Sequence, residues 1–347
     1  MCYLKGLLAV LLSLSFNPIA IADDLFVNSG FTNEVLRYSG ATGSFISSFV
    51  TSGSGGLSLP QGLVFGPNGN LFVASNNFGS PGQVMEYNGA TGAFIREFVT
   101  SGSGGVQGPR GIVFGPNGDF YVSSFSAGNK VMRYNGVTGA FLSAFDIHDD
   151  GANPLSPNSL VFGPNGNLFI ATQGFGEVVE YTAGGTFVRT FVPRFSGGLN
   201  LPFDLTFGLN GNLFLTDAGQ SAVLEYNGTT GAFIRNFVSP GSGGLDNAAG
   251  MSFGPNGDLF VVSGSNSSRV LEYDGSTGAF VRIFVSSGSG GLSSPSYLVF
   301  HSTTTVPEPS VLTLLASGSA LLLCWRAYRR RIANQHLTDA ATYGPQA

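Results

Sequence analysis

One eight-residue stretch, Phe65-Gly-Pro-Asn-Gly-Asn-Leu-Phe72, returns with small changes four more times along the chain. The copies begin at Phe114, Phe162, Phe207 and Phe253, so the intervals between them are 49, 48, 45 and 46 residues. Short apolar runs and glycine-rich turns that recur at this spacing indicate propeller blades or another solenoid-like array. The chain is therefore expected to fold as a series of similar units.

Each repeat contains four short runs that are rich in β-branched and aromatic residues and bounded by turn sequences, which predicts four strands. In the turn Gly66-Pro67-Asn68-Gly69, proline supplies the fixed φ of a type I turn and Gly69 takes the position that favours positive φ. Asn88-Gly89 forms a similar tight connection between the third and fourth strands. Tight hairpins between successive strands make each repeat an antiparallel blade.

The two ends of the repeat array are complementary. The array starts at Asp24-Leu25-Phe26-Val27, a second strand with no first strand before it, and ends at Tyr297-Leu298-Val299-Phe300, a first strand with nothing after it. Together they complete one blade, and a ring closed in this way has no open sheet edges. We therefore predict an all-β, six-bladed β-propeller over residues 23–302, closed by a composite N-/C-terminal blade.

The repeats resemble the NHL-repeat family of propellers. Pro60-Gln61-Gly62, Pro109-Arg110-Gly111 and Gly69-Asn70-Leu71-Phe72-Val73-Ala74 carry the resemblance, which covers nearly all of residues 24–301. The resemblance implies the same blade architecture. The family's Asp after the first strand is replaced here by Gly-Pro, and its Asp after the second strand remains only at Asp217.

Residues 1–22 have the layout of a secretory signal peptide. Lys5 precedes an apolar run from Leu7 to Phe16, and Ala20-Ile21-Ala22 supplies a small-x-small cleavage site with Ala20 and Ala22 at its small positions. We expect cleavage after Ala22 and export of the body. The alternative is an uncleaved membrane anchor.

The C-terminal end predicts a single membrane span. Residues 303–309 form a linker that contains Pro307-Glu308-Pro309, and residues 310–325 form an uncharged run expected to be a transmembrane helix. The tail, residues 326–347, begins with a cluster of arginines and should stay in the cytoplasm. A plain stop-transfer anchor, holding a membrane-bound sensor domain, is the alternative interpretation of this end.

This end also resembles the PEP-CTERM sorting signal of Gram-negative bacteria, in which a Pro-Glu-Pro motif, one short span and an arginine cluster are recognised by an exosortase. The resemblance implies an exosortase-type protease as partner and cleavage near Pro307, Glu308 and Pro309. An inner-membrane-anchored precursor would then be released or transferred to the cell surface or the extracellular medium. The tail differs from the family because it continues from Ile332 to Ala347.

Composition limits the partners of the body. Of the 20 acidic and 15 basic residues, two acids and five bases lie outside residues 23–305, which leaves 18 against 10 and a net charge of −8. No basic patch is evident, so nucleic acid is not expected as a partner. Both cysteines, Cys2 and Cys324, lie in the terminal segments, so no disulfide is expected within the body.

A binding site, if present, is expected at one mouth of the central channel. The longer and more varied loops should gather on one face of the ring, and loops on a rigid scaffold often carry sites. The polar residues placed there, at the start of each innermost strand, are Gln61, Arg110, Asn158, Asp204 and Tyr297. The alternative is that these residues only solvate the rim of the channel.

One loop differs from the Gly-Ser-Gly-Gly connections found between other blades. It reads Asp146-Ile147-His148-Asp149-Asp150-Gly151. Carboxylates and an imidazole are ligands for a divalent cation, so Asp146, His148, Asp149 and Asp150 are candidate metal ligands. An exposed acidic loop without metal is the alternative, and no other cofactor is indicated.

The sequence favours a non-catalytic binding or scaffold protein of the cell surface or extracellular matrix, with exopolysaccharide or a surface protein as its partner. A single histidine well inside the body, His148, does not support a Ser-His-Asp arrangement. The alternative function is a metal-dependent, lactonase-like or lyase-like propeller enzyme. Such enzymes need acids or histidines that converge on the channel, and Asp204 is the only acid among the expected mouth residues.

Overall fold

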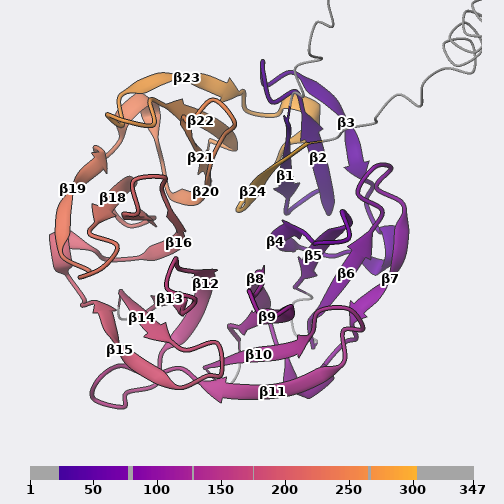
Figure 1. The fold of residues 1–347 in the computed structure, drawn as a ribbon. Coiled ribbons are helices and arrows are strands. Elements are labelled where there is room, and N and C mark those ends of the chain that lie inside the picture. The colour runs from indigo at the N-terminus through magenta and orange to yellow at the C-terminus, as the bar shows by residue number, and fades with distance from the viewer. Residues whose placement is uncertain (1–22, 77–80, 127–128, 175, 265–266, 303–347) are drawn as a thin grey trace, which may run out of the picture. The chain divides into compact units, whose positions relative to one another are not determined.

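The computed structural model describes residues 23–76, 81–126, 129–174, 176–264 and 267–302. These residues form six four-stranded antiparallel sheets arranged as blades around a central axis (Figure 1). The strands β4, β8, β12, β16, β20 and β24 are innermost. The predicted all-β, six-bladed propeller is confirmed. The predicted span over 310–325 lies outside the described residues, among which no helix is long and apolar enough to cross a membrane.

In blades 2 to 6 the strands follow chain order from the axis outwards, and in blade 1 the last strand of the chain takes the innermost place. Blade 1 consists of β24 (Leu298–Ser302), β1 (Asp23–Ser29), β2 (Glu34–Tyr38) and β3 (Phe45–Val50). Blade 2 consists of β4 (Pro60–Phe65), β5 (Leu71–Ser75), β6 (Gln83–Tyr87) and β7 (Phe94–Val99). Blade 3 consists of β8 (Pro109–Phe114), β9 (Asp119–Ser124), β10 (Lys130–Asn135) and β11 (Phe141–Asp146).

The remaining blades have the same order. Blade 4 consists of β12 (Ser156–Phe162), β13 (Leu168–Gln173), β14 (Glu177–Tyr181) and β15 (Phe187–Val192). Blade 5 consists of β16 (Pro202–Phe207), β17 (Leu213–Asp217), β18 (Ala222–Tyr226) and β19 (Phe233–Val238). Blade 6 consists of β20 (Ala248–Phe253), β21 (Leu259–Ser263), β22 (Arg269–Tyr273) and β23 (Phe280–Val285).

Blade 1 is assembled from both ends of the propeller. Strand β24 pairs antiparallel with β1, with Val27 opposite Leu298 and Asp23 opposite Ser302. Asn28, which is fully buried, donates to the Pro60 carbonyl of blade 2 at 2.6 Å and accepts from the Tyr297 backbone N–H at 2.8 Å. The composite blade predicted from the half-repeats therefore closes the ring.

Aromatic side chains form the core between neighbouring blades. Phe72 is buried and meets Phe98 of its own blade edge-on at 4.8 Å and Phe114 of the next blade at 5.1 Å, measured between ring centroids. The same trio recurs around the ring, for example at Phe214, Phe237 and Phe253. Such edge-to-face pairs add to the stabilisation from apolar burial. The recurring phenylalanines therefore serve blade packing.

Short 3-10 turns join most blades. They are η1 (Ser54–Gly56), η2 (Ser103–Gly105), η3 (Ser196–Gly198), η4 (Ser242–Gly244) and η5 (Ser289–Gly291). In each turn, the backbone carbonyl of the first residue accepts a hydrogen bond from the hydroxyl of a buried tyrosine. For example, Tyr87 donates to the Ser54 carbonyl at 2.9 Å. Gly55 has φ of +63°, and the ring of Phe94 lies where a Cβ would project. Glycine is therefore required at this point of the turn.

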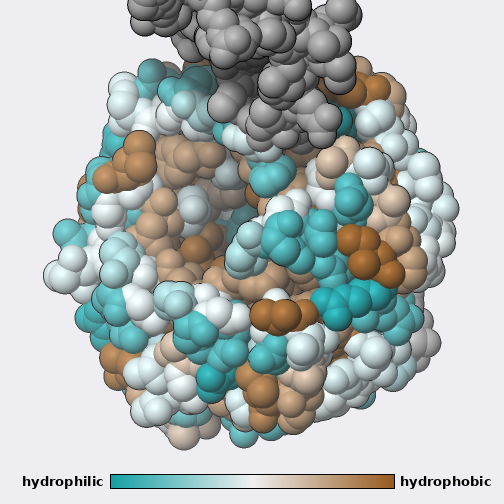
Figure 2. Space-filling model, turned by 45° about the vertical axis from the view of Figure 1, so that its right-hand side comes forward, coloured by the Kyte–Doolittle hydropathy of each residue, from teal (hydrophilic) through white to brown (hydrophobic). Residues whose placement is uncertain are grey.

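The outer surface is mixed in character. Figure 2 shows hydrophilic and hydrophobic residues interspersed over one side of the molecule. The outermost strands of the blades carry half-exposed apolar residues, such as Ile46, Ile95 and Ile234. Scattered exposed apolar residues of this kind are common on soluble surfaces and need no partner.

Candidate ligand pocket at the channel mouth

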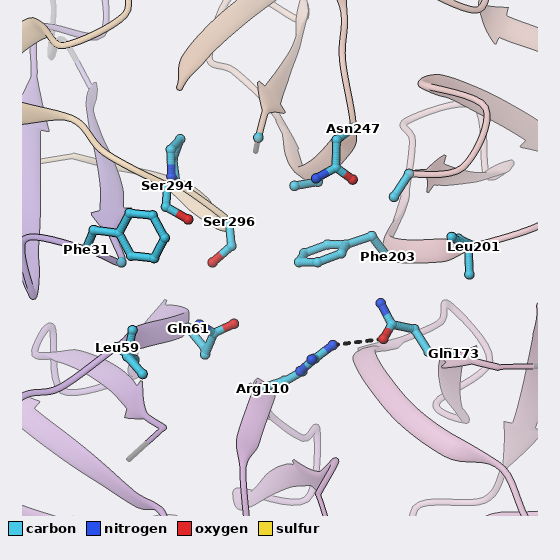
Figure 3. Close-up of a pocket in the computed structure, with 15 residues that line it drawn as sticks. Phe31, Leu59, Gln61, Arg110, Gln173, Leu201, Phe203, Asn247, Ser294 and Ser296 are labelled. Atoms are coloured by element: carbon cyan, nitrogen blue, oxygen red, sulfur yellow. Dashed lines mark hydrogen bonds between the residues drawn. The ribbon is translucent and has the colours of Figure 1, made fainter. Parts of the chain in front are cut away.

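A pocket of about 360 Å³ opens at one end of the central channel, and every blade contributes to its lining (Figure 3). Blade 1 supplies Phe31 and Ser296 at the entrance. Among the described residues, the lining consists of Gly30, Phe31, Leu59, Gln61, Arg110, Gln173, Leu201, Phe203, Ala218, Asn247, Ala249, Gly264, Ser294, Pro295 and Ser296. The residues come from the starts of innermost strands and from the loops that precede or face them. This is the face of the ring on which the longer and more varied loops were predicted to gather.

Arg110, at the start of β8, points into the pocket and is held by neutral groups. Its Nη1 donates to Asn158 Oδ1 at 2.7 Å and to Gln173 Oε1 at 3.1 Å. The guanidinium carbon lies 3.3 Å from the centroid of the Phe125 ring. Its Nε is buried without a hydrogen-bond partner among the described residues. Burial lowers the pKa of Arg110, with the Tyr297 hydroxyl acting in the opposite direction.

Asn158 and Asp204 lie inside the ring and join blades. Asn158 is fully buried and donates from Nδ2 to the Phe203 carbonyl of blade 5 at 2.7 Å. Asp204, also buried, accepts from the Ser159 hydroxyl at 2.6 Å and from the Met251 N–H of blade 6 at 3.0 Å. Neither residue belongs to the pocket lining. Their polar groups bond within the propeller, and Asn158 contacts the pocket lining through Arg110 and Phe203.

The environment of Asp204 favours its neutral form. Burial raises the pKa of this carboxyl and outweighs the hydrogen bonds from Ser159, Met251 and Leu205, which lower it. Tyr297 lies nearby with its ring 5.3 Å from Phe203, between centroids, and it is 6% exposed. Burial, and secondarily the charge of Asp204, raise the pKa of Tyr297. Its hydroxyl has no hydrogen-bond partner of good geometry among the described residues.

Close approach of the innermost strands explains the small residues of the channel. A Cβ on Gly62 would lie 2.2 Å from the Arg110 carbonyl oxygen, and one on Gly111 would lie 2.8 Å from Ser159 Cα. A Cβ on Gly250 would lie 2.6 Å from the Ser296 carbonyl oxygen, which accepts a 2.7 Å bond from the Gly250 N–H. Neighbouring innermost strands are therefore in close contact at these three glycines.

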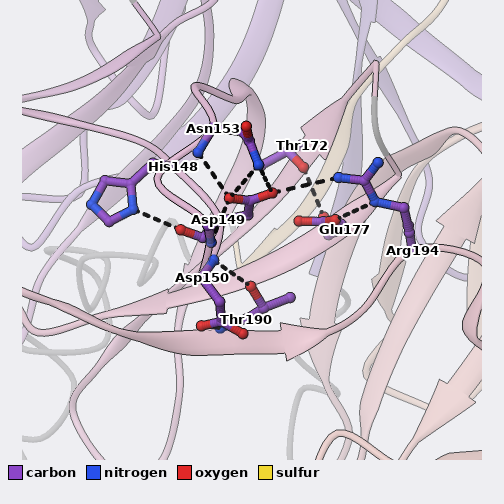
Figure 4. Close-up of polar contacts among 9 residues, drawn as sticks. His148, Asp149, Asp150, Asn153, Thr172, Glu177, Thr190 and Arg194 are labelled. Carbon is purple, nitrogen blue, oxygen red and sulfur yellow. Dashed lines mark hydrogen bonds and ion pairs between the residues drawn. The ribbon is translucent and has the colours of Figure 1, made fainter.

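The acidic loop after β11 contacts Thr190 on β15, the outermost strand of blade 4 (Figure 4). None of its residues is among the described residues that line the pocket. Asp149 accepts from the Gly151 N–H at 2.8 Å and from Asn153 Nδ2 at 2.8 Å, and Arg194 approaches it to 3.5 Å. Arg194 also pairs with Glu177 at 2.8 Å. The hydrogen bonds from Asn153 are the main reason that the pKa of Asp149 is lowered.

The other predicted metal ligands of this loop point elsewhere. Asp146 pairs with Lys130, Asp150 accepts from the Thr190 N–H at 3.1 Å, and the His148 ring packs 4.7 Å from Phe187 between centroids. Within the part of the chain that the structure describes, no three His, Cys, Asp or Glu side chains are grouped to hold a metal ion. The geometry therefore does not gather Asp146, His148, Asp149 and Asp150 into one ligand set.

Several pocket residues were not predicted from the sequence. Gln173 ends β13, and Phe31, Asn247, Ser294 and Ser296 lie in connections between strands. Aligning the repeats could have identified Gln173, because the corresponding strand ends in Ser75, Ser124, Asp217 or Ser263 in other blades. The loop residues carry no such signal, because their contact with the pocket depends on how the ring closes.

The predicted processing residues, Ala20, Ala22, Pro307, Glu308 and Pro309, lie outside the described residues. No protein-family model matches the sequence, and no curated protein matches it either. Solved structures match at the level of fold. A nidogen–laminin complex matches with a TM-score of 0.60 at 14% identity, over 80% of this chain and 98% of the matched chain.

Two enzymes are among the other structural neighbours. Virginiamycin B lyase from Staphylococcus aureus matches with a TM-score of 0.56 at 14% identity, over 81% of this chain and 88% of the lyase. The periplasmic gluconolactonase of Pseudomonas aeruginosa matches with a TM-score of 0.55 at 18% identity, over 81% and 99%. At such identities the likeness establishes the six-bladed propeller fold alone, on which binding proteins and enzymes both occur.

Proposed function

We propose that this chain is an exported, exosortase-processed β-propeller of the cell surface or extracellular matrix, and that it binds a ligand in the channel-mouth pocket. The observation that carries the binding role is the pocket itself. All six blades contribute to it, and its lining combines amides, hydroxyls and a guanidinium with the exposed ring of Phe31 and the half-buried ring of Phe203. Few polar groups on a concave, partly apolar surface are typical of ligand sites. A polysaccharide or a surface protein is the proposed partner.

The composition of the pocket favours binding over catalysis. The described residues of its lining include neither a carboxylate nor an imidazole, the groups that most often transfer protons in hydrolases and lyases. The nearby acid, Asp204, is bonded within the ring. His148 lies in the outer loop, and His301 stacks on Phe65 at 3.6 Å between centroids, also away from the pocket.

A lactonase-like or lyase-like activity is the second candidate, and the two enzymes among the structural neighbours motivate it. It requires a proton-transfer group at the pocket. The candidate is Tyr297, which is buried beside the lining residue Phe203 and is not itself among the lining residues that the structure describes. Raised pKa values of Tyr297 and Asp204 would suit acids better than bases. Turnover of lactones or cyclic esters by the purified chain, abolished in Tyr297→Phe, would support this candidate against the binding role.

The export and processing proposal rests on the two terminal segments and is tested by mass. The full chain is expressed in a Gram-negative host with and without an exosortase, and the product on cells and in the medium is analysed by intact-mass spectrometry. We expect an N-terminus at Asp23, and a C-terminus near Pro307-Glu308-Pro309 only when the exosortase is present. A surface product that keeps residues 310–347 in both strains would contradict the processing.

A further inference from the structure

Arg110 differs from most arginines of the described residues because it does not pair with a carboxylate. The guanidinium groups that pair with carboxylates are Arg37, Arg96, Arg133, Arg189, Arg194, Arg235 and Arg282. Arg110 bonds only to two neutral amides, through a single nitrogen, Nη1. Its positive charge at the pocket is therefore not neutralised by any carboxylate among the described residues.

The free part of the guanidinium is the part that recognises anions. Nη2 has no hydrogen bond within the described residues, and Nε is buried and has no partner. Because Nε is closed to solvent, Nη2 is the nitrogen that can donate a charge-assisted hydrogen bond to an anion in the pocket. The side chain is also held in place, since Phe125 covers one face and Asn158 and Gln173 fix Nη1. Little side-chain entropy is then lost when an anion binds.

The rest of the pocket suits a ligand with several hydroxyl groups. Gln61, Gln173 and Asn247 present amides, and Ser294 and Ser296 present hydroxyls, around the space above Arg110 (Figure 3). Phe31, with 74% of its surface exposed, and Phe203 present aromatic rings at the same space. A pocket of about 360 Å³ is of the size that holds a small molecule.

We infer that the channel-mouth pocket binds an acidic saccharide, whose carboxylate pairs with Arg110 and whose hydroxyl groups bond to the surrounding amides and serines. This inference rests on the proposed binding function and gives it a ligand class. A sugar phosphate presents similar oxygens. The carboxylate is favoured because the described lining residues include one cation, Arg110, and a phosphate dianion would leave one negative charge without a partner there.

The test is calorimetric titration of the exported chain with glucuronate, with glucose as the neutral analogue and glucose 6-phosphate as the phosphate analogue. We expect glucuronate to bind at least about tenfold more tightly than either. In Arg110→Gln we expect its affinity to fall by about 10- to 100-fold, as the loss of a hydrogen-bonded charge pair implies. Arg269→Gln is the matched control, because Arg269 also lacks a carboxylate partner among the described residues but lies outside the pocket.

Folding of each variant is checked by its thermal melt, and Phe31→Ala gives an independent reading because Phe31 is exposed and its loss does not open the core. We expect Phe31→Ala to weaken glucuronate binding several-fold. Glucuronate binding that is absent, or equal in the wild type and Arg110→Gln, would overturn the inference, as would tighter binding of glucose 6-phosphate. Equal binding of glucose and glucuronate would overturn the acidic ligand while leaving the proposed binding function intact.

Discussion

At the scale of single residues, the blades distribute their charges in two ways. In blade 5, Glu225 on β18 accepts from Arg235 at 2.7 Å and from Asn212 at 2.8 Å. In blade 3, the arginine moves inward to β10, where Arg133 pairs with Asp119 at 2.5 Å and Ser143 takes the outer position. Both blades therefore contain a carboxylate–arginine pair, although the two residues stand on different strands. A charge next to the buried sheet needs such a partner.

The pH dependence of this network follows from Glu225. Burial raises its pKa, but hydrogen bonds from Asn212, Arg235 and Asn210 together outweigh burial, so its pKa lies below the ordinary 4.5. Because the pKa of Glu225 is lower in the folded than in the unfolded state, its ionised carboxylate stabilises the fold at pH values above the ordinary pKa. This stabilisation is lost as the pH falls through the lowered pKa. We expect Glu225→Gln to cost about 1–3 kcal/mol of unfolding free energy at pH 7.

Urea unfolding of the wild type and Glu225→Gln at several pH values checks this expectation. The difference in unfolding free energy should shrink as the pH falls from about 5 to 3, since the wild-type carboxylate becomes protonated. The exposed Glu97, on β7, provides the control, and Glu97→Gln should leave stability unchanged. A difference that is constant over this range would mean that Glu225 is not held as a carboxylate.

Asp204 should show the opposite trend. Because burial raises its pKa above the ordinary 3.8, the folded state holds the proton more tightly than the unfolded state. Its contribution to stability is therefore full at low pH and declines as pH rises through the raised pKa. Asp204→Asn should cost about 1–3 kcal/mol near pH 4, because its amide would meet the Met251 N–H, and the cost should be smaller at pH 8.

The measurement is again the unfolding free energy of both proteins, here by guanidinium titration at pH 4, 6 and 8. The difference between wild type and Asp204→Asn should decrease steadily with pH. If it grows with pH instead, Asp204 is ionised in the folded protein and its three donors outweigh burial. Glu225 is present in both proteins, so its own titration cancels in the comparison.

At the scale of elements, neighbouring innermost strands approach each other so closely at Gly62, Gly111 and Gly250 that an added side chain there would overlap the next strand. Gly62 on β4 faces the Arg110 carbonyl of β8, where a Cβ would lie 2.2 Å away. Farther from the axis, arginines on the outermost strands donate hydrogen bonds to the next blade. For example, Arg96 Nη2 donates to the Val137 carbonyl of the next blade at 2.8 Å. The blades are thus joined near the axis by backbone contact and near the rim by long side chains.

Gly62→Ala tests the contact near the axis. The added methyl group would push β4 away from β8, and overpacking of this kind costs about 1–3 kcal/mol. The control is Gly184→Ala, since the nearest atom to a Cβ there is Thr182 Oγ1 at 3.7 Å. Urea unfolding should show a clear loss of stability for Gly62→Ala and none for Gly184→Ala. Equal stabilities would mean that the inner strands can separate without cost.

At the scale of the whole molecule, the ring depends on one pairing between residues far apart in the sequence. Strand β24 completes blade 1 beside β1, and Asn28 links both strands to blade 2. Without this pairing the innermost position of blade 1 would be empty and a sheet edge would be exposed. Ring closure therefore couples the stability of the two ends of the propeller.

A disulfide across the closure tests this coupling. Asp23 and Ser302 are register partners in an antiparallel pair, whose Cα separation suits a disulfide, and no cysteine occurs between residues 23 and 302. Asp23→Cys combined with Ser302→Cys should form a bridge that stabilises the fold by about 4–5 kcal/mol when oxidised, as a very long closed loop predicts. The melting temperatures of the oxidised and reduced forms measure this. No rise on oxidation would argue against the pairing of β1 with β24.

The repeat period, the strand pattern and the complementary half-repeats determined the six-bladed fold from the sequence alone. They did so because each blade repeats the same local alternation and turn chemistry. The assignment of the mouth residues needed the tertiary structure. Gln61 and Arg110 face the pocket, whereas Asn158, at the equivalent place in its blade, bonds to the next blade. Asp204 stands one position further along its strand, at the place that Gly62 takes in blade 2, and also bonds to the next blade. Which direction a polar side chain takes depends on the donors and acceptors that the neighbouring blade offers, and only the closed ring brings those groups within reach.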